Sequence, residues 1–129
     1  INIVCPKGFE PPKEIIEVAK NKSDYNSEIL VTDNLVEGVK GSNVLYTDVW
    51  SSMGQESKKS LKEERFEGYT LNKDIISKAE NDVIIMHCLP AYRGKEISND
   101  VFESSRSRIF NQAENRLHAQ QALLTKLTK

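Results

Sequence analysis

Short β-branched runs alternate with helix-forming segments along this chain, and this alternation limits the fold more than any other feature. Strands are predicted at residues 1–5, 28–32, 43–47, 82–86 and 108–110, and helices at 11–20, 57–66, 72–78 and 111–126, with brief helical turns at 35–39 and between 98 and 108. Parallel strands need crossover connections of about a dozen residues, which helices usually supply. The spacing therefore predicts an α/β fold with one parallel sheet and helices packed on it.

Two of the predicted helices carry an apolar face that we expect to be buried. These residues are Ile15, Ile16, Val18 and Ala19 in the first helix, and Ala113, Leu117, Leu124 and Leu127 in the last. Asn111 and Glu114 have the spacing of a capping box, which predicts that the last helix opens there. The helix at 57–66 is mostly charged, so we expect it to be solvated and able to move as a lid.

Charge and length limit the class of partner. The 129 residues suffice for one domain, and 18 basic against 19 acidic side chains leave a net charge of −1. This balance gives no field that would hold nucleic acid or an anionic membrane. No apolar run approaches the roughly 20 residues that span a bilayer, and the first residues do not resemble a signal peptide. We therefore expect a soluble, cytoplasmic protein with no nucleic-acid or membrane partner.

Polar side chains with catalytic potential follow two of the predicted strands. The apolar run at 82–86, which is typical of a strand buried on both faces, leads directly into His87, Cys88, Leu89 and Pro90. Asp48 follows the strand at 43–47. Open α/β folds bind their ligands at the carboxyl edge of the sheet, where such residues gather. This edge is the candidate active site.

Each of these residues also has an ordinary structural explanation, and the sequence leaves both open. Asp48 could cap a turn, as most aspartates after strands do. Cys88 could be an inert, reduced thiol like Cys5, although a charged His87 beside it would favour the thiolate. Neighbours on an extended strand point to opposite faces, which argues against direct contact of the two. A zinc site from His87, Cys88, Cys5 and His118 is disfavoured because closely spaced ligand pairs are lacking.

Arg116 is predicted in the first turn of the last helix. A cation at that position opposes the helix macrodipole by roughly 0.3–1 kcal/mol. An anionic ligand held by the helix end and the guanidinium would offset this cost, and so would an ion pair with Glu114. The sequence leaves the choice between the two open.

Three motifs, in this order and at these separations, closely resemble the signatures of ornithine carbamoyltransferase. They are Asp48-Val49-Trp50-Ser51-Ser52-Met53-Gly54-Gln55-Glu56, His87-Cys88-Leu89-Pro90 and Glu114-Asn115-Arg116. Supporting similarity runs from residues 6–11 through 66–69 to the final helix, which is nearly the whole chain. The Ser-Met-Gly loop resembles the ornithine type rather than the aspartate, acetylornithine or putrescine types.

The resemblance implies a Rossmann-like domain and a reaction without metal or organic cofactor. The δ-amine of ornithine would attack carbamoyl phosphate, giving citrulline and phosphate. By motif, Asp48 would pair with the α-ammonium of ornithine, while Ser52 and Met53 would shape its pocket. Cys88 would be the catalytic residue near the reacting amine, and the backbone at Cys88 and Leu89 would face the carbamoyl group. Arg116 would help to hold carbamoyl phosphate, and the Leu89–Pro90 bond is expected to be cis.

Parts of the family pattern are unmatched in this sequence. The carbamoyl-phosphate-binding domain has no counterpart, and neither has the first strand-helix unit of the ornithine-binding domain. Residues 1–129 are therefore interpreted as the distal part of that domain, keeping half of the site and inactive alone. The complete enzyme would be a homotrimer or a higher multiple. The second hypothesis is a non-catalytic α/β amino-acid-binding module or a degenerate paralogue.

Overall fold

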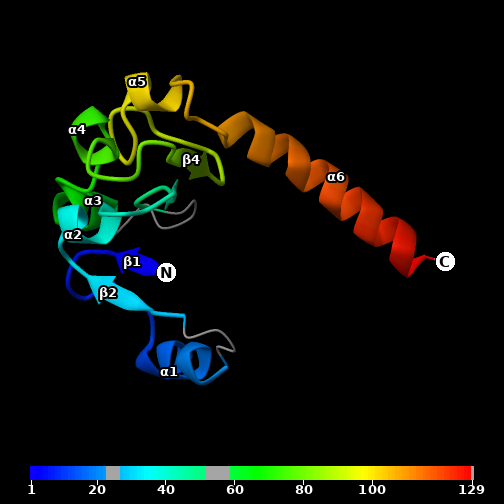
Figure 1. Cartoon of the computed structure of the whole chain (residues 1–129), viewed down its shortest axis with the longest axis horizontal. Coiled ribbons are helices and arrows are strands. Elements are labelled where there is room, and N and C mark those ends of the chain that lie inside the picture. Colours follow the sequence, from blue (N-terminus) through cyan, green and yellow to red (C-terminus); the bar gives the residue numbers. More distant parts are fainter. Residues whose placement is uncertain (23–26, 52–58, 129) are drawn as a thin grey trace.

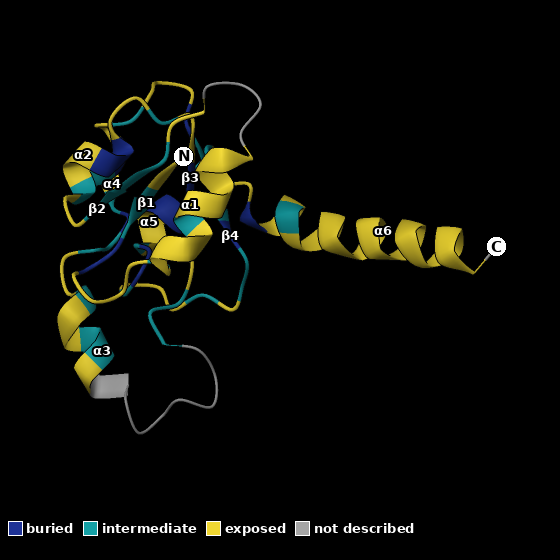
Figure 2. Ribbon diagram, turned by 90° about the horizontal axis from the view of Figure 1, so that it is seen from below, coloured by how far each residue is buried: buried dark blue, intermediate teal, exposed yellow. Residues whose placement is uncertain are grey.

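The computed structural model describes residues 1–22, 27–51 and 59–128, without the side chains of residues 59 and 60. The strands are β1 (Asn2–Val4), β2 (Leu30–Thr32), β3 (Val44–Thr47) and β4 (Ile84–His87); Figure 1 labels β1, β2 and β4, and Figure 2 labels β3. The helices are α1 (Lys13–Asn21), α2 (Leu35–Val39), α3 (Lys59–Phe66), α4 (Lys73–Ile76), α5 (Asn99–Phe102) and α6 (Ile109–Leu127). The α/β class predicted from the alternation is confirmed.

The strands form two parallel pairs rather than the single predicted sheet. β1 pairs with β2, and β3 pairs with β4, both in parallel register. Within the described parts of the chain no ladder joins β1 to β3. A cavity of about 840 Å3 is lined by both strands, including Asn2 and Val4 on one side and Val44 and Tyr46 on the other. Each pair therefore has one strand edge facing the same hollow.

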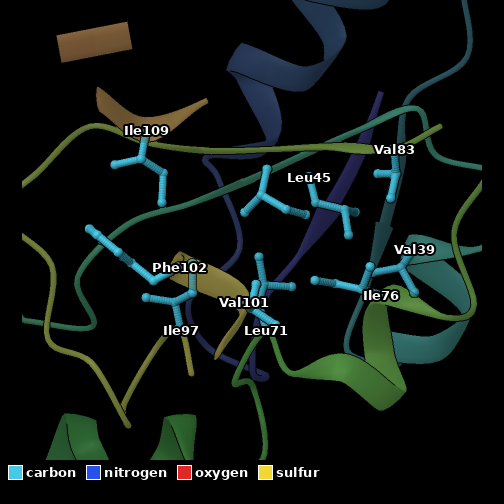
Figure 3. Packing of buried hydrophobic residues seen from close by; sticks show 10 residues of the cluster. Val39, Leu45, Leu71, Ile76, Val83, Ile97, Val101, Phe102 and Ile109 are labelled. Carbon is cyan, nitrogen blue, oxygen red and sulfur yellow. The ribbon is translucent and has the colours of Figure 1, made fainter. Parts of the chain in front are cut away.

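The hydrophobic core gathers around the β3–β4 pair and the helices beside it (Figure 3). Its fully or nearly fully buried members are Val39, Leu45, Leu71, Ile76, Val83, Ile85, Ile97, Val101, Phe102 and Ile109. Asn34 and Asn72 accept hydrogen bonds from the amides of Glu37 and Ile75 and thereby cap the N-termini of α2 and α4. These caps fix α2 and α4 against the core.

The prediction of a last strand at 108–110 was wrong, because α6 already begins at Ile109. Ile85 N–H donates to Arg106 O, and Arg108 N–H donates to Ile85 O, so the segment at 106–109 follows the edge of β4 only briefly. Ser107 makes an isolated bridge with Ile85, and α6 begins at Ile109 with Arg108 as its N-cap. The start predicted at Asn111 was therefore wrong by two residues. The buried Ile109 side chain fixes the earlier start, because it anchors the first turn in the core.

The expected burial of the first and last helices was wrong. No residue of α1 is buried, with Ile15 58% and Val18 50% exposed. α6 extends away from the rest of the molecule, and Leu117, Leu124 and Leu127 on its expected inner face are more than half exposed (Figures 1 and 2). The faces are amphipathic as predicted, but nothing in the described structure covers them. None of the described helices has the length and apolarity needed to cross a membrane.

Candidate functional site

Asp48 and Cys88 lie side by side because they follow two paired strands. Thr47 and His87 are partners in the parallel β3–β4 register, so the next residue of each strand emerges at the same carboxyl edge. Cys88 Sγ donates a hydrogen bond to Asp48 Oδ1 at 2.9 Å, across 40 residues of sequence. The structure thus brings together side chains that follow two different strands, as the sequence predicted for this edge.

In the described structure, the Asp48 carboxylate uses only one of its two oxygens for hydrogen bonds. Its Oδ1 accepts the Cys88 thiol and also the Val49 N–H at 2.7 Å, the turn-capping contact that the sequence left open. Both contacts involve Oδ1, so Oδ2 has no hydrogen-bond partner among the residues that the structure describes. Asp48 is exposed and lines the cavity between β1 and β3. A carboxylate in this setting can bind a cationic group of a ligand.

The environment of Cys88 keeps its thiol protonated. Burial raises the pKa of Cys88 above its ordinary value of 9.0, and the hydrogen bond to Asp48 and the charge of that carboxylate raise it further. Its own backbone and the Tyr46 hydroxyl act in the opposite direction and are smaller influences. A thiol of raised pKa is a hydrogen-bond donor at neutral pH rather than a thiolate nucleophile. The suggestion that His87 favours the thiolate is therefore wrong.

His87 turns inward, away from Cys88. The side chain is fully buried, its Nδ1 accepts the Leu89 N–H at 2.8 Å, and its Nε2 lies 3.2 Å from Glu96 Oε1. Glu96, also fully buried, accepts the Tyr92 N–H at 2.6 Å through the same oxygen. Sequence reasoning did not find Glu96, because a single acid in a loop carries no signal that it will be buried.

Leu89 has an unusual backbone conformation. Its φ of +57° makes it the one described non-glycine residue in the left-handed region, and the bond to Pro90 is cis as predicted. The left-handed conformation costs roughly 1–2 kcal/mol for a residue with a Cβ atom. Because the Leu89 N–H is engaged by His87, this amide faces into the protein.

Gln112, in the first turn of α6, joins the two strands of the site. Its Oε1 accepts the His87 N–H at 3.1 Å, and its Nε2 donates to the Tyr46 hydroxyl at 2.7 Å. The sequence did not single out this residue, since a glutamine near a helix start is usually a solvated side chain. The contact connects α6 to both β3 and β4 at the site.

Arg116 is not in the first turn of α6. The helix begins at Ile109, so Arg116 is its eighth residue and lies one turn beyond Gln112 on the same face. The argument from an unfavourable first-turn cation therefore fails for this position. Arg116 is exposed, and no described hydrogen bond or ion pair joins it to Asp48 or Cys88. Glu114 faces His118 rather than Arg116, and its Oε1 lies 3.7 Å from His118 Nε2.

The loop after Asp48 starts in an aromatic cluster. Trp50 stacks near Phe66 with ring centroids 6.2 Å apart, and Phe66 also contacts Phe9 and Tyr69. This cluster accounts for a large apolar side chain in a polar loop. Ser52 and Met53 lie outside the described residues. In the described ranges, no group of three or more His, Cys, Asp or Glu side chains could hold a metal ion.

Comparison with known proteins identifies the family to which this chain belongs. The family model for the Asp/Orn binding domain of aspartate/ornithine carbamoyltransferase matches residues 1–127. This chain belongs to that family. An ornithine carbamoyltransferase of Prochlorococcus marinus is 58% identical over 127 residues, covering 98% of this chain and 40% of the relative. One from Methanosphaera stadtmanae is 47% identical, covering 100% and 43%.

Solved carbamoyltransferases share the fold. The anabolic ornithine carbamoyltransferase of Campylobacter jejuni superposes with a TM-score of 0.88 at 37% identity, covering 98% of this chain and 43% of that one. The Pyrococcus furiosus ornithine carbamoyltransferase superposes with a TM-score of 0.86 at 41% identity, covering 95% and 40%. The chain therefore spans about two fifths of the length of its carbamoyltransferase relatives.

Proposed function

We propose that this chain supplies the ornithine-binding half of an ornithine carbamoyltransferase. The relatives named above are ornithine carbamoyltransferases, and the Asp48–Cys88 contact carries the proposal at the level of atoms. In the reaction, the δ-amine of ornithine attacks the carbonyl carbon of carbamoyl phosphate. A C–N bond forms, the bond to the phosphate oxygen breaks, phosphate leaves with the electron pair, and the leaving phosphate takes up the proton that the amine nitrogen releases.

Asp48 binds the amino-acid end of ornithine in this proposal. Its open Oδ2 accepts the α-ammonium in a charge-assisted hydrogen bond, while Oδ1 keeps its two protein donors. Ser52 and Met53 complete the pocket around the amino-acid end. The contact to Asp48 places the Cys88 thiol close to the bound substrate, where it orients the reacting amine as a neutral hydrogen-bond partner.

The carbamoyl phosphate side of the site is assigned to Leu89 and Arg116, together with the backbone of Cys88. Because the Leu89 N–H is bonded to His87, its contribution comes from the carbonyl group. Arg116 lies one turn beyond Gln112 on the same face of α6, which favours a role at the rim of the site. One guanidinium is seldom enough to stabilise the developing charge, so further donors come from the rest of the enzyme.

The two strand edges support the interpretation of residues 1–129 as an incomplete domain. A further parallel strand between β1 and β3 would pair with both edges and join the four strands into one sheet. Its carboxyl end would then lie beside Asp48, at the edge where α/β folds bind ligands. We assign this place to the missing first strand of the ornithine-binding domain. We assign the carbamoyl-phosphate-binding domain and the homotrimer contacts to the part of the relatives that residues 1–129 do not match.

Complementation tests the function. This chain is mixed with the part of the Prochlorococcus marinus relative outside the matched region, and citrulline formation from ornithine and carbamoyl phosphate is measured. We expect turnover that neither part gives alone, and we expect Asp48→Asn to reduce it about 10- to 100-fold, since a charged hydrogen bond is worth about 1.5–3 kcal/mol and also orients the substrate. Glu80→Gln, an exposed acid near β4, is the matched control.

The same mixture distinguishes the non-catalytic alternative. Calorimetry with ornithine and with a bisubstrate analogue measures binding separately from turnover. Tight binding that depends on Asp48, with no citrulline, would identify an amino-acid-binding module. Turnover that Asp48→Asn leaves unchanged would reject the assignment of this residue.

A further inference from the structure

Two polar side chains are completely buried beside the site, and the proposed chemistry uses neither of them. His87 and Glu96 are both 0% exposed, and in the described chain they are the only polar or charged residues in the buried class. Burying polar groups is unfavourable unless hydrogen bonds replace water. Their contacts therefore indicate what they do for the structure around them.

The hydrogen bonds of His87 define its protonation. The Leu89 amide is a donor only, so His87 Nδ1 carries no proton and the imidazole is neutral. Its proton is on Nε2, which donates to Glu96 Oε1. Glu96 Oε1 also accepts the Tyr92 N–H, so one carboxylate oxygen holds both the imidazole and the far side of the loop. The segment from residue 87 to residue 96 is closed on itself by these bonds.

The closed segment contains the turn that carries Cys88. Leu89 has its φ at +57°, a conformation that a leucine keeps only where its surroundings enforce it. The bond from the Leu89 amide to His87 Nδ1 is made in this conformation. The direction in which the chain leaves β4, and with it the position of Cys88 Sγ, therefore depends on the imidazole.

Gln112 also holds this turn, through a hydrogen bond to the backbone at its first residue, His87. It holds the His87 amide and the Tyr46 hydroxyl, which belongs to the strand that carries Asp48. The Tyr46 side chain also influences the Cys88 thiol, since it lowers the pKa of Cys88. The contacts of Gln112 with His87 and Tyr46 therefore help to set the distance between the Cys88 and Asp48 side chains.

We propose that His87, Glu96 and Gln112 are positioning residues that hold the Cys88 thiol on the Asp48 carboxylate. They touch the backbone of the turn or its neighbours, and none of them bonds to the Cys88 sulfur. The inference rests on the proposed function only in taking Asp48 and Cys88 as the residues that bind and orient the substrate. The contacts of His87, Glu96 and Gln112 that support it all lie within this chain.

The test measures the reactivity of Cys88 in this chain with Cys5 replaced by Ala. The rate of alkylation by iodoacetamide is followed from pH 6 to pH 11, which gives the apparent pKa of Cys88. We expect Glu96→Leu and His87→Phe to lower this pKa toward that of an ordinary cysteine and to raise the rate at neutral pH severalfold. Glu96→Gln, which keeps an oxygen acceptor at the same place, restores the original profile.

Two further variants separate positioning from stability. Val101→Ala shortens a buried core side chain of α5, outside the segment from residue 87 to residue 96, and we expect it to lower the urea midpoint without moving the pKa of Cys88. Gln112→Leu removes both bonds of a partly exposed side chain and is expected to fold even where Glu96→Leu does not. It should lower the pKa of Cys88 in the same direction.

The proposal is overturned if Gln112→Leu leaves the profile unchanged, or if Val101→Ala shifts it as much as the positioning variants do. Alkylation involves neither ornithine nor carbamoyl phosphate. A failure of complementation would therefore reject the proposed function and leave this result standing, and the reverse also holds.

Discussion

At the scale of single residues, the site depends on a carboxylate and a thiol that share one hydrogen bond. Asp48 Oδ1 accepts from Cys88 Sγ at 2.9 Å, and burial together with this carboxylate raises the pKa of the thiol. Cys88 is therefore suited to orienting an amine and unsuited to acting as a thiolate at neutral pH. The negative charge remains on Asp48, where an ammonium group can use it.

The raised pKa values predict a loss of stability at alkaline pH. Burial raises the pKa of Cys88. Burial also raises the pKa of Cys5, and the charges of Glu10 and Asp33 raise it further. The pKa of Tyr69 is raised as well, mainly by burial. A group whose folded pKa exceeds its unfolded value stabilises the fold below the unfolded value, and this stability is lost as pH rises through the folded value. We expect the free energy of unfolding to fall from about pH 9 upward, because free thiols ionise near 8.5.

Urea unfolding at pH 7.5 and pH 10 measures this effect. Cys5→Ala and Cys88→Ala should each make the difference between the two pH values smaller, because each removes one group that ionises earlier in the unfolded chain. An alkaline loss that is the same in both variants as in the parent chain would contradict the assignment to the thiols.

At the scale of elements, α2 approaches β1 closely because residue 38 has no side chain. A Cβ atom at Gly38 would collide with the Val4 side chain. Alanine is ordinarily better than glycine inside a helix by about 1 kcal/mol, and here we expect the opposite sign. Gly38→Ala should destabilise the fold by about 1–3 kcal/mol, the usual cost of overpacking.

A double-mutant cycle identifies the cause. Val4→Ala removes the methyl groups that meet the new Cβ atom, so Gly38→Ala should cost much less in that background, as measured by urea unfolding. Equal costs in the two backgrounds would show that the Val4 contact is not responsible.

The elements differ in how well the sequence predicted them. The alternation of β-branched runs with helix-forming segments located α2, α4 and the four strands of the two pairs. The start of α6 was misplaced, because Asn111 and Glu114 resemble a capping box while the buried Ile109 sets the actual start. A local capping signal was outweighed by a tertiary contact.

At the scale of the whole molecule, α6 is a long helix with little to pack against. Beyond Gln112 every described residue of it is exposed (Figure 2). Helices without tertiary contacts are marginal in water even at 12–15 residues. We expect backbone amides at 116–127 to exchange with deuterium orders of magnitude faster than the amide of Ile85 in the core. Slow exchange along α6 in the monomer would contradict this expectation.

A shorter chain provides the control for the same prediction. Ending it after residue 114 keeps Ile109 and Gln112, which make the contacts of α6 with the core and the site. The urea midpoint should change little. Ile109→Ala in the full-length chain should lower the free energy of unfolding by about 2–5 kcal/mol, as buried isoleucines do.

The sequence by itself determined the α/β class, the order of the elements and the emergence of Asp48 and Cys88 at strand ends, because these follow from short-range periodicity and from the rule that parallel strands end at one edge. Tertiary structure alone decided that Glu96 would be buried on His87, that Gln112 would join β3 to β4, and that Arg116 would lie two residues farther along α6 than expected. Those features depend on contacts between residues far apart in the chain or on where the core anchors a helix. Neither leaves a local pattern from which it could be predicted.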